Sequence, residues 1–160
     1  GFTQVLRERG AARVLAVDVG HGQLAPQIAA DSGVSVVEGF NVRYMTPESL
    51  AKAIGGGVDA PSVVTGDLSF ISLTLVVPAL AAATEPGGDL LLMVKPQFEV
   101  GRKDLGARGV VTDPMLQARA VDTVVSQASA LGWTLMGTAP SRITGQDGNR
   151  EFFVHVMRST

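Results

Sequence analysis

A glycine-rich turn between two β-rich runs is the first part of the chain whose residues could bind a ligand. The pattern Gly20-x-Gly22-x-x-Ala25 follows a short apolar run, and Glu38 ends the next one. This combination is typical of dinucleotide binding, in which a helix N-terminus holds the pyrophosphate and the acid binds a ribose. However, Asp18 directly precedes the turn, where its carboxylate would repel that pyrophosphate.

Asp18 is compatible with a different ligand. A carboxylate at the end of a strand can accept both hydrogen bonds of a ribose diol, which suits an adenosine without phosphates. S-adenosylmethionine (SAM) is such a ligand. Three interpretations of the turn stay open: an ordinary surface turn, an NAD site with Gly20, Gly22 and Glu38, and a SAM site with Asp18.

Lys95 is the second candidate for chemistry. It ends the apolar run 90–94, while Asp67 ends an earlier β-rich run and Glu151 opens the last one. A neutral lysine amine can remove a proton, and a charged one can stabilise a developing oxyanion. The plainer interpretations are a lysine that reaches water, a helix N-cap and a solvated edge residue. One amine grouped with two carboxylates at strand ends favours catalysis.

The elements that would position these residues alternate between strands and helices. Strands are expected at 13–18, 34–38, 62–67, 89–95, 133–138 and 152–157. Helices are expected at 23–30, 47–54, 72–83 and 114–131, with N-caps at Thr46 and Asp113.

This order of elements predicts a fold class. The last two strands are joined by a loop without a helix, so they should pair antiparallel. The run 89–95 shows no alternation, as expected for a strand buried on both faces. The pattern predicts one domain, an α/β fold with a doubly wound, mostly parallel sheet and an antiparallel C-terminal edge.

Composition excludes several classes of function. The 160 residues contain no cysteine and two histidines, so disulfide scaffolds, cysteine nucleophiles and metal sites built from thiolates or several histidines are ruled out. The net charge of −2 excludes a polycation that holds nucleic acid by bulk charge. No apolar run reaches the about 18 residues of a membrane span, and the first residues do not form a signal peptide. We expect a cytoplasmic protein with no membrane partner and no metal.

Positive charge is concentrated late in the chain. Residues 101–160 carry seven Lys and Arg against five Asp and Glu, whereas residues 1–100 carry six against ten. The loop 101–111 contains Arg102, Lys103 and Arg108, just past Lys95. A solvated loop and an RNA phosphate contact are both open interpretations, and the position beside Lys95 favours RNA. Phe98 can stack on a nucleotide base or pack against the protein.

Three segments taken together resemble a known family. They are 66–73 (GDLSFISL), 94–101 (VKPQFEVG) and 148–153 (GNREFF). Their order and spacing are similar to those of the hemolysin-A family of FtsJ-like ribosomal RNA 2′-O-methyltransferases, and the resemblance extends over essentially all 160 residues. It implies a Rossmann-like methyltransferase fold, SAM as cofactor, ribosomal RNA or ribosomal subunits as partner, and cytidines of both subunits as targets.

The resemblance also implies roles for individual residues. Three members of the family's Lys–Asp–Lys–Glu catalytic tetrad match Asp67, Lys95 and Glu151. Contacts with the cofactor are implied for Gly1, Asp18, Val19, Asn41 and Asp67, although Asn41 could equally form a local turn.

The same resemblance implies that part of the protein lies upstream of Gly1. The first lysine of the tetrad, the first strand, most of the SAM-binding loop and an S4-type RNA-binding domain are expected there. The chain is thus expected to be the larger, C-terminal part of a methyltransferase domain, without activity by itself.

Two alternatives to methylation are considered. One is an NAD-dependent oxidoreductase that uses the Gly20 and Gly22 turn with Glu38. The other is a non-enzymatic hemolysin, which would need an amphipathic or membrane-spanning apolar segment, and none is evident. The target nucleotides and the oligomeric state do not follow from the sequence.

Overall fold

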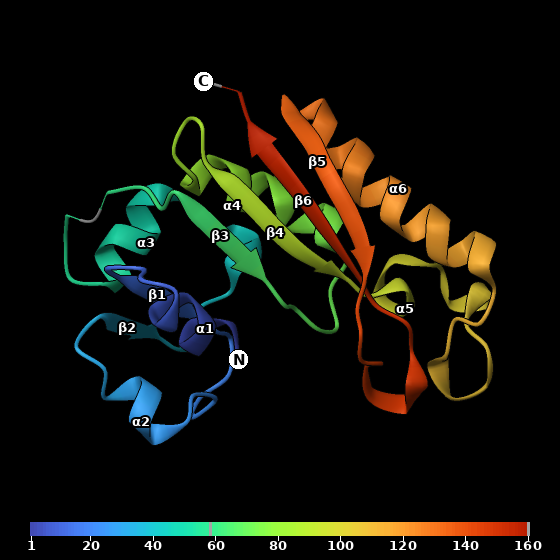
Figure 1. Ribbon diagram of the computed structural model, residues 1–160, viewed down its shortest axis with the longest axis horizontal. Coiled ribbons are helices and arrows are strands. Elements are labelled where there is room, and N and C mark those ends of the chain that lie inside the picture. Colours follow the sequence, from blue (N-terminus) through green and yellow to red (C-terminus); the bar gives the residue numbers. More distant parts are fainter. Residues whose placement is uncertain (58, 160) are drawn as a thin grey trace. The chain divides into compact units, whose positions relative to one another are not determined.

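Strands and helices alternate along the chain, as the sequence predicted (Figure 1). The computed structural model describes residues 1–57 and 59–159. The chain divides into two compact units, Gly1–Asp59 and Ala60–Thr160, and each is described by itself.

The first unit is built on two short parallel strands. β1 (Val14–Val17) pairs with β2 (Val34–Val37), and Val14 lies opposite Val34. Its helices are α1 (Phe2–Glu8), α2 (Pro26–Ala29), the 3-10 turn η1 (Val42–Tyr44) and α3 (Pro47–Ala53). α2 is much shorter than the helix predicted for residues 23–30, because Ala25 is extended and Pro26 begins the helix.

The N-terminus of α3 confirms the cap predicted from the sequence. The Thr46 hydroxyl accepts a hydrogen bond from the Ser49 amide at 3.1 Å, and the Ser49 hydroxyl accepts one from the Thr46 amide at 2.9 Å. This reciprocal capping box satisfies two backbone donors that would otherwise lack partners. The helix therefore begins where the local sequence specifies.

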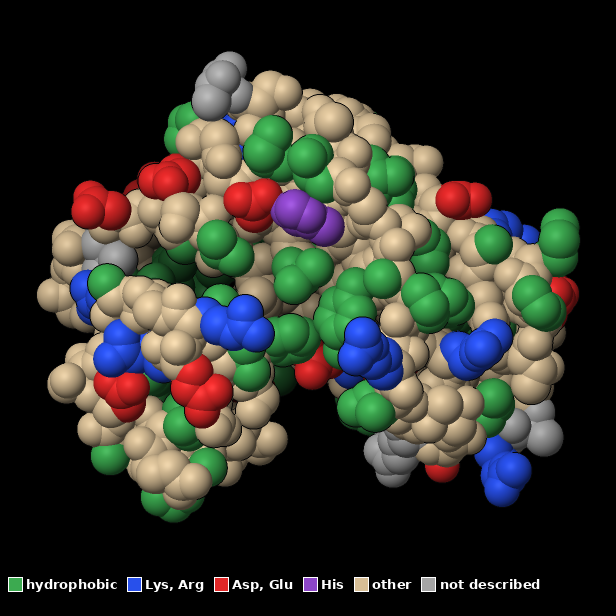
Figure 2. Space-filling model, in the orientation of Figure 1, with side chains coloured by type: hydrophobic (Ala, Val, Ile, Leu, Met, Phe, Trp, Pro, Cys, Tyr) green, Lys and Arg blue, Asp and Glu red, His purple; other side chains and the backbone are tan. Residues whose placement is uncertain are grey.

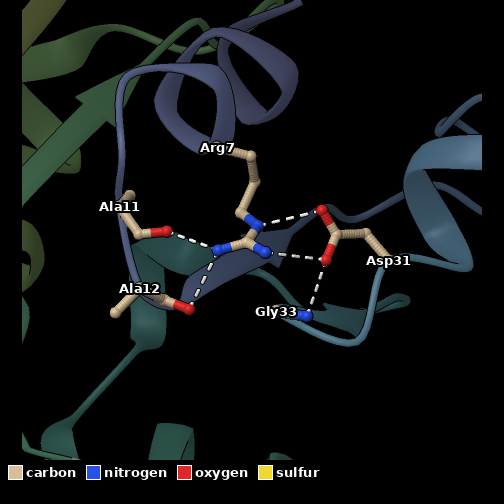
Figure 3. Close-up of polar contacts among 5 residues, drawn as sticks. All are labelled: Arg7, Ala11, Ala12, Asp31 and Gly33. Carbon is tan, nitrogen blue, oxygen red and sulfur yellow. Dashed lines mark hydrogen bonds and ion pairs between the residues drawn. The ribbon is translucent and has the colours of Figure 1, made fainter.

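α1 was not predicted, and an ion pair attaches it to the rest of its unit (Figure 3). The guanidinium of Arg7 binds both carboxylate oxygens of Asp31, at 2.9 and 3.0 Å, and donates to the carbonyls of Ala11 and Ala12. The Gly33 amide donates to the same carboxylate at 2.7 Å. A Cβ at Gly33 would collide with the guanidinium, so glycine is required for this approach.

The second unit contains a four-stranded mixed sheet in the order β3-β4-β6-β5. β3 (Val63–Gly66) is parallel to β4 (Asp89–Val94), whereas β6 (Phe152–Arg158) is antiparallel to both β4 and β5 (Trp133–Pro140). The α/β class and the antiparallel C-terminal edge are confirmed. The strands of the described residues pair in the order β1-β2 in the first unit and β3-β4-β6-β5 in the second.

Two helices cover one face of this sheet (Figure 1). The helices are α4 (Val77–Ala83) and α6 (Pro114–Ala130), and Leu90, Leu92 and Val94 of β4 are completely buried against this side. Leu91 and Met93, which point to the other face, are only partly buried. The prediction that residues 89–95 are buried on both faces was therefore wrong, because burial alternates along β4 despite the continuous apolar sequence.

Prolines and caps decide how the remaining helices begin. The predicted helix 72–83 is divided into the 3-10 turn η2 (Leu73–Leu75) and α4, with Pro78 in the first turn of α4. The predicted N-cap of α6 is confirmed, since the Asp113 carboxylate accepts from the Met115 amide at 2.8 Å. The short α5 (Pro96–Glu99) was not predicted.

Among the described residues, no helix combines the length and hydropathy that a membrane crossing requires.

The Arg7–Asp31 pair makes the stability of the first unit depend on pH. The hydrogen bond from Arg7, and next the one from the Gly33 amide, lower the pKa of Asp31 below its ordinary value of 3.8. A lowered pKa means that the folded state binds fewer protons than the unfolded state. The stabilisation is therefore present above pH 3.8 and is lost as the pH falls through the folded-state pKa.

We expect Asp31→Asn to lower the free energy of unfolding at pH 7, with a difference from the parent that shrinks below pH 3.8. Urea unfolding at a series of pH values measures this. The control is Glu8→Gln, which changes an exposed acid on α1 and should have a much smaller effect. A difference between parent and Asp31→Asn that persisted unchanged at pH 2 would contradict the assignment.

Candidate active site

Lys95 lies at the carboxyl end of β4, and its amine contacts two side chains from the loop after β3. Lys95 Nζ lies 2.8 Å from Asp67 Oδ1 and donates a hydrogen bond to Ser69 Oγ at 3.0 Å. The Lys95 side chain is 12% exposed, whereas that of Asp67 is 45% exposed. The structure therefore brings together two residues that the sequence singled out and adds Ser69.

The neighbouring parallel strands explain why these loops meet. β3 and β4 pair with Gly66 opposite Leu92, so both strands end at the same edge of the sheet. A Cβ at Gly66 would lie 2.8 Å from Leu92 Cδ2, which makes glycine the residue that lets the strands pack here. Asp67 follows directly and faces Lys95 rather than capping a helix, because Ser72 caps η2.

Glu151 lies at the same edge, just before β6. Val94 pairs with Phe152 in the antiparallel register, so Lys95 and Glu151 are the next residues along these two strands. Glu151 is 9% exposed, and its carboxylate lies so close to Gly145 that a Cβ there would collide with it. The solvated interpretation of Glu151 is therefore excluded, and the acid is a buried neighbour of the strand end that carries Lys95.

Glu99, which sequence reasoning missed, connects the same two loops a few residues further along. Its carboxylate accepts hydrogen bonds from the Ser72 hydroxyl at 2.6 Å and from the Leu73 amide at 2.7 Å. Burial raises the pKa of Glu99, while these two hydrogen bonds act in the opposite direction. The only signal in the sequence was its place in the string VKPQFEVG.

Phe70 is an exposed aromatic residue beside this cluster. Its side chain is 89% exposed, and its φ of 63° is in the left-handed region that bulky residues rarely adopt. The Phe70 ring packs against Phe98 of α5 with ring centroids 5.2 Å apart, so Phe98, which is partly buried, contacts an exposed ring. An exposed aromatic residue in this conformation, which directly follows the Ser69 that contacts Lys95, is typical of a functional surface.

The loop 101–111, called the basic loop from here on, contains exposed cations beyond α5. Arg102 and Lys103 lie in η3 (Arg102–Asp104), and Arg108 lies in η4 (Ala107–Gly109) with a φ of 61°. Figure 2 shows Lys and Arg side chains at the lower end of this unit, over the loops that follow β4 and β5. The side chains of Arg102, Lys103 and Arg108 are exposed, and their contact with RNA stays a prediction.

Buried amides fix the end of this loop. The Asn149 side chain accepts from the Val111 amide at 3.0 Å and donates to the Gly109 carbonyl at 3.3 Å. Gln117 of α6 donates to the Val111 carbonyl at 2.8 Å. The basic loop is therefore tied both to α6 and to the segment that leads into Glu151.

The residues expected to bind the cofactor through the first unit follow its two strands. Asp18 and Asn41 come after β1 and β2, and the Phe40 amide donates to the Asp18 carbonyl at 3.0 Å. Asp18, Asn41 and Val19 are exposed, as is Gly1 at the start of α1. Asp18 Oδ1 accepts from the Gly20 amide at 2.7 Å, and Asn41 Oδ1 accepts from the Arg43 amide at 3.0 Å.

The geometry of the glycine turn does not suit a dinucleotide. The Gly22 amide donates to the Glu38 carboxylate at 2.6 Å, so this N–H of the turn already has an anionic partner and is not free for a pyrophosphate. α2 begins only at Pro26, and no helix N-terminus follows directly on Gly22 to hold a pyrophosphate. Among the described residues, no group of three or more His, Cys, Asp or Glu is placed to hold a metal ion.

Comparison with known proteins identifies relatives along the whole chain. A Mycobacterium tuberculosis protein named 16S/23S rRNA (cytidine-2′-O)-methyltransferase TlyA is 48% identical over 160 residues. The match covers 100% of this chain and 57% of that protein. Hemolysin A from Brachyspira hyodysenteriae is 32% identical over 157 residues, which are 98% of this chain and 63% of that one. The chain thus spans little more than half the length of the curated relatives it matches.

Solved structures agree with this similarity. A protein from Lactococcus lactis whose name carries the hemolysin label superposes with a TM-score of 0.91 at 37% identity, over 99% of this chain and 73% of that chain. A SAM-dependent methyltransferase from Mesorhizobium loti has a TM-score of 0.64 at 13% identity, over 98% and 85% of the two chains, which shows a shared fold. The family model described as FtsJ-like methyltransferase matches residues 1–158. The chain therefore belongs to the FtsJ-like methyltransferase family.

Proposed function

We propose that the protein carries out SAM-dependent 2′-O-methylation of ribose in ribosomal RNA, with cytidines of 16S and 23S rRNA as the targets. The observation that carries this proposal is the contact of Lys95 with Asp67 and Ser69 at the sheet edge of an FtsJ-like chain. The name of the 48% identical relative supplies the target class. The activity is assigned to the full-length protein, in which residues 1–160 form part of one methyltransferase domain and an S4-type domain lies upstream.

Lys95 acts on the proton of the ribose hydroxyl. A 2′-hydroxyl is a weak nucleophile until its proton is removed or strongly polarised, so the site needs a base or a cation at the oxygen. Lys95 presents an amine at the sheet edge on a largely buried stem, held by Asp67 and Ser69. It either accepts the proton as a neutral amine or stabilises the developing alkoxide as a cation.

Asp67 and Glu151 supply the negative charge around that amine. Asp67 contacts it directly and sets its direction, and Glu151 is the buried acid on the adjoining strand end. Holding the amine in one position is what such partners contribute to catalysis. We therefore assign Lys95 as the proton-handling group, with Asp67 and Glu151 as its partners.

Residues of the first unit fit the adenosine part of SAM. Asp18 is an exposed carboxylate after a parallel strand, and a carboxylate can accept several hydrogen bonds besides the one from Gly20. Asn41, Val19 and Gly1 are exposed as well and are the other proposed contacts in this unit. When bound, SAM supplies a methyl group already activated by its sulfonium, so the protein's task is alignment and proton handling.

The exposed cations of the basic loop are proposed to bind RNA phosphates. Arg102, Lys103 and Arg108 lie beyond α5, in the same unit as Lys95, and phosphate contacts would orient the RNA without selecting its sequence. Ribosomal RNA or a ribosomal subunit is the proposed partner, and the cytoplasm is the proposed location. The geometry of the glycine turn and of Glu38 gives no support to an NAD-dependent reaction.

We expect Lys95→Ala to lower the methyl-transfer rate by about 10²–10⁴-fold, because it removes the base and the alkoxide stabiliser together. Lys95→Arg should not restore the rate, since a guanidinium does not give up its proton at neutral pH. The assay is transfer of labelled methyl groups from SAM to ribosomal RNA by the full-length protein, with SAM affinity measured separately. Lys52→Ala, which removes an exposed lysine of α3, should behave as the parent. An arginine variant with near-parent turnover would exclude Lys95 as the base.

Asp18→Ala should weaken SAM binding by about 1–3 kcal/mol, the cost of leaving polar partners unpaired. Asp18→Asn is the sharper variant, because its amide oxygen can still accept from Gly20 while the charge is removed. Calorimetry with SAM, and with NAD as the second ligand, measures both. If both variants bound SAM like the parent, or if the parent bound NAD instead, the cofactor assignment would fail.

The variant with alanine at Arg102, Lys103 and Arg108 should bind ribosomal RNA more weakly and with a shallower salt dependence. Each lost phosphate contact should reduce the log–log salt slope by roughly 0.7–0.9. A triple alanine variant at Arg9, Arg13 and Lys52 removes the same charge from exposed positions of the first unit. SAM affinity should be unchanged in both. Equal RNA affinity and equal salt slopes in the two triple variants would show that the loop is only solvated.

A further inference from the structure

Glu99 and Lys95 tie the same loop at two points. The loop 67–73 leaves β3, and the segment 95–99 leaves β4. At one end, Lys95 Nζ contacts Asp67 and Ser69 at 2.8 and 3.0 Å. At the other end, Glu99 accepts from the Ser72 hydroxyl at 2.6 Å and from the Leu73 amide at 2.7 Å. The single turn of α5 spans the distance between the two ties.

A strained residue lies between the ties. Phe70 has a φ of 63°, a conformation that is costly for a bulky side chain. Such a conformation persists only where the surrounding structure holds the backbone at several points. The Lys95 contacts lie before Phe70, the Glu99 contacts lie after it, and Phe98 packs against its ring at 5.2 Å. All three fixed points come from the segment 95–99.

The surroundings of Glu99 suit a side chain that holds a neighbouring loop in place. The group is partly buried, and its two donors are a hydroxyl and a backbone amide rather than a cation. Burial raises its pKa, which shows that the buried position disfavours the carboxylate. The hydrogen bonds of this partly buried acid go to Ser72 and Leu73, and neither Lys95 nor the basic loop is among their donors. What Glu99 does is fix Ser72 and Leu73 relative to α5.

We propose that Glu99 is a positioning residue for methyl transfer: it holds the loop 67–73 so that Asp67 and Ser69 direct the Lys95 amine. The inference rests on the proposed function. Without the tie at Ser72 and Leu73, the loop can relax the strain at Phe70 and move Asp67 and Ser69 away from Lys95. Misplacement of a catalytic group by about 1 Å can cost about 10²-fold in rate.

The test compares Glu99→Ala with Glu99→Gln in the full-length protein. Glu99→Ala should lower kcat for methyl transfer by about 10- to 100-fold. Affinities for SAM and RNA should stay within about twofold, since Glu99 lies outside the proposed contacts with either. Glu99→Gln should recover most of kcat. The side-chain oxygen of the new glutamine can accept a hydrogen bond from the Leu73 amide, and its nitrogen can donate one to the Ser72 oxygen. The Ser72 hydroxyl can then donate to Thr74 Oγ1, which lies 2.6 Å away.

Two further variants separate positioning from a general loss of stability. Ser72→Ala removes one of the two donors and should give a smaller loss of kcat than Glu99→Ala. Glu85→Gln changes a partly buried acid in the turn before β4 of the same unit and should leave kcat at the parent value. If Glu99→Ala does not fold, the kcat values of the other proteins still test the proposal. We expect kcat to be highest in the parent, lower in Glu99→Gln and lowest in Ser72→Ala. Equal values for all three would overturn the proposal.

Hydrogen exchange provides a readout that does not depend on activity. The amides of Leu73, Thr74 and Leu75, which donate to Glu99, to the Ser72 hydroxyl and to the Ser72 carbonyl, should exchange faster in Glu99→Ala than in the parent. The amides of β4 and β6 should keep their protection. Unchanged exchange at these three amides, or a parent-like kcat in Glu99→Ala, would overturn the proposal. A folded parent without methyl transfer to ribosomal RNA would instead overturn the proposed function, and the role in catalysis with it. The exchange data would then report on the tie alone.

Discussion

The contact between Lys95 and Asp67 is the interaction on which the candidate site depends. The Lys95 side chain is only 12% exposed, and an amine held largely out of water needs a hydrogen-bond partner in the protein. Asp67 meets this need because β3 and β4 are parallel neighbours that end at the same edge. Gly66 lets the strands pack at that point, and the antiparallel β6 brings Glu151 beside the end of β4. The topology of the sheet therefore gathers one amine and two acids.

The positions of two side chains that contact Lys95 depend on a loop rather than on a strand. Asp67 and Ser69 lie on a loop that would be free to move if only its start were fixed. Glu99 fixes its far end, and the left-handed conformation of Phe70 shows that the path between the ties is constrained. The buried amide of Asn149 acts similarly on the basic loop, since it binds Gly109 and Val111. Buried polar side chains thus anchor loops whose exposed residues are free to contact a partner.

The turn in the first unit shows how one sequence pattern can suggest two ligands. Gly20, Gly22 and Glu38 match a dinucleotide fingerprint by spacing. In the folded chain, Glu38 accepts from Gly22 and Asp18 accepts from Gly20, so the two carboxylates stabilise the turn itself. The pattern alone cannot show which backbone donors are already satisfied. That information comes from the fold.

From the sequence we could predict the alternation of strands and helices, the caps Thr46 and Asp113, the family and the candidates Asp67 and Lys95. These features follow from local signals, namely apolar runs, capping residues and short motifs. The folded chain was needed to find the contact of Lys95 with Ser69, the partners of Glu99, the half-buried face of β4 and the helices α1 and α5. Ser69 and Lys95 are 26 residues apart, and Ser72 and Glu99 are 27 apart. Contacts between such distant residues depend on how strands pair, which no local pattern records.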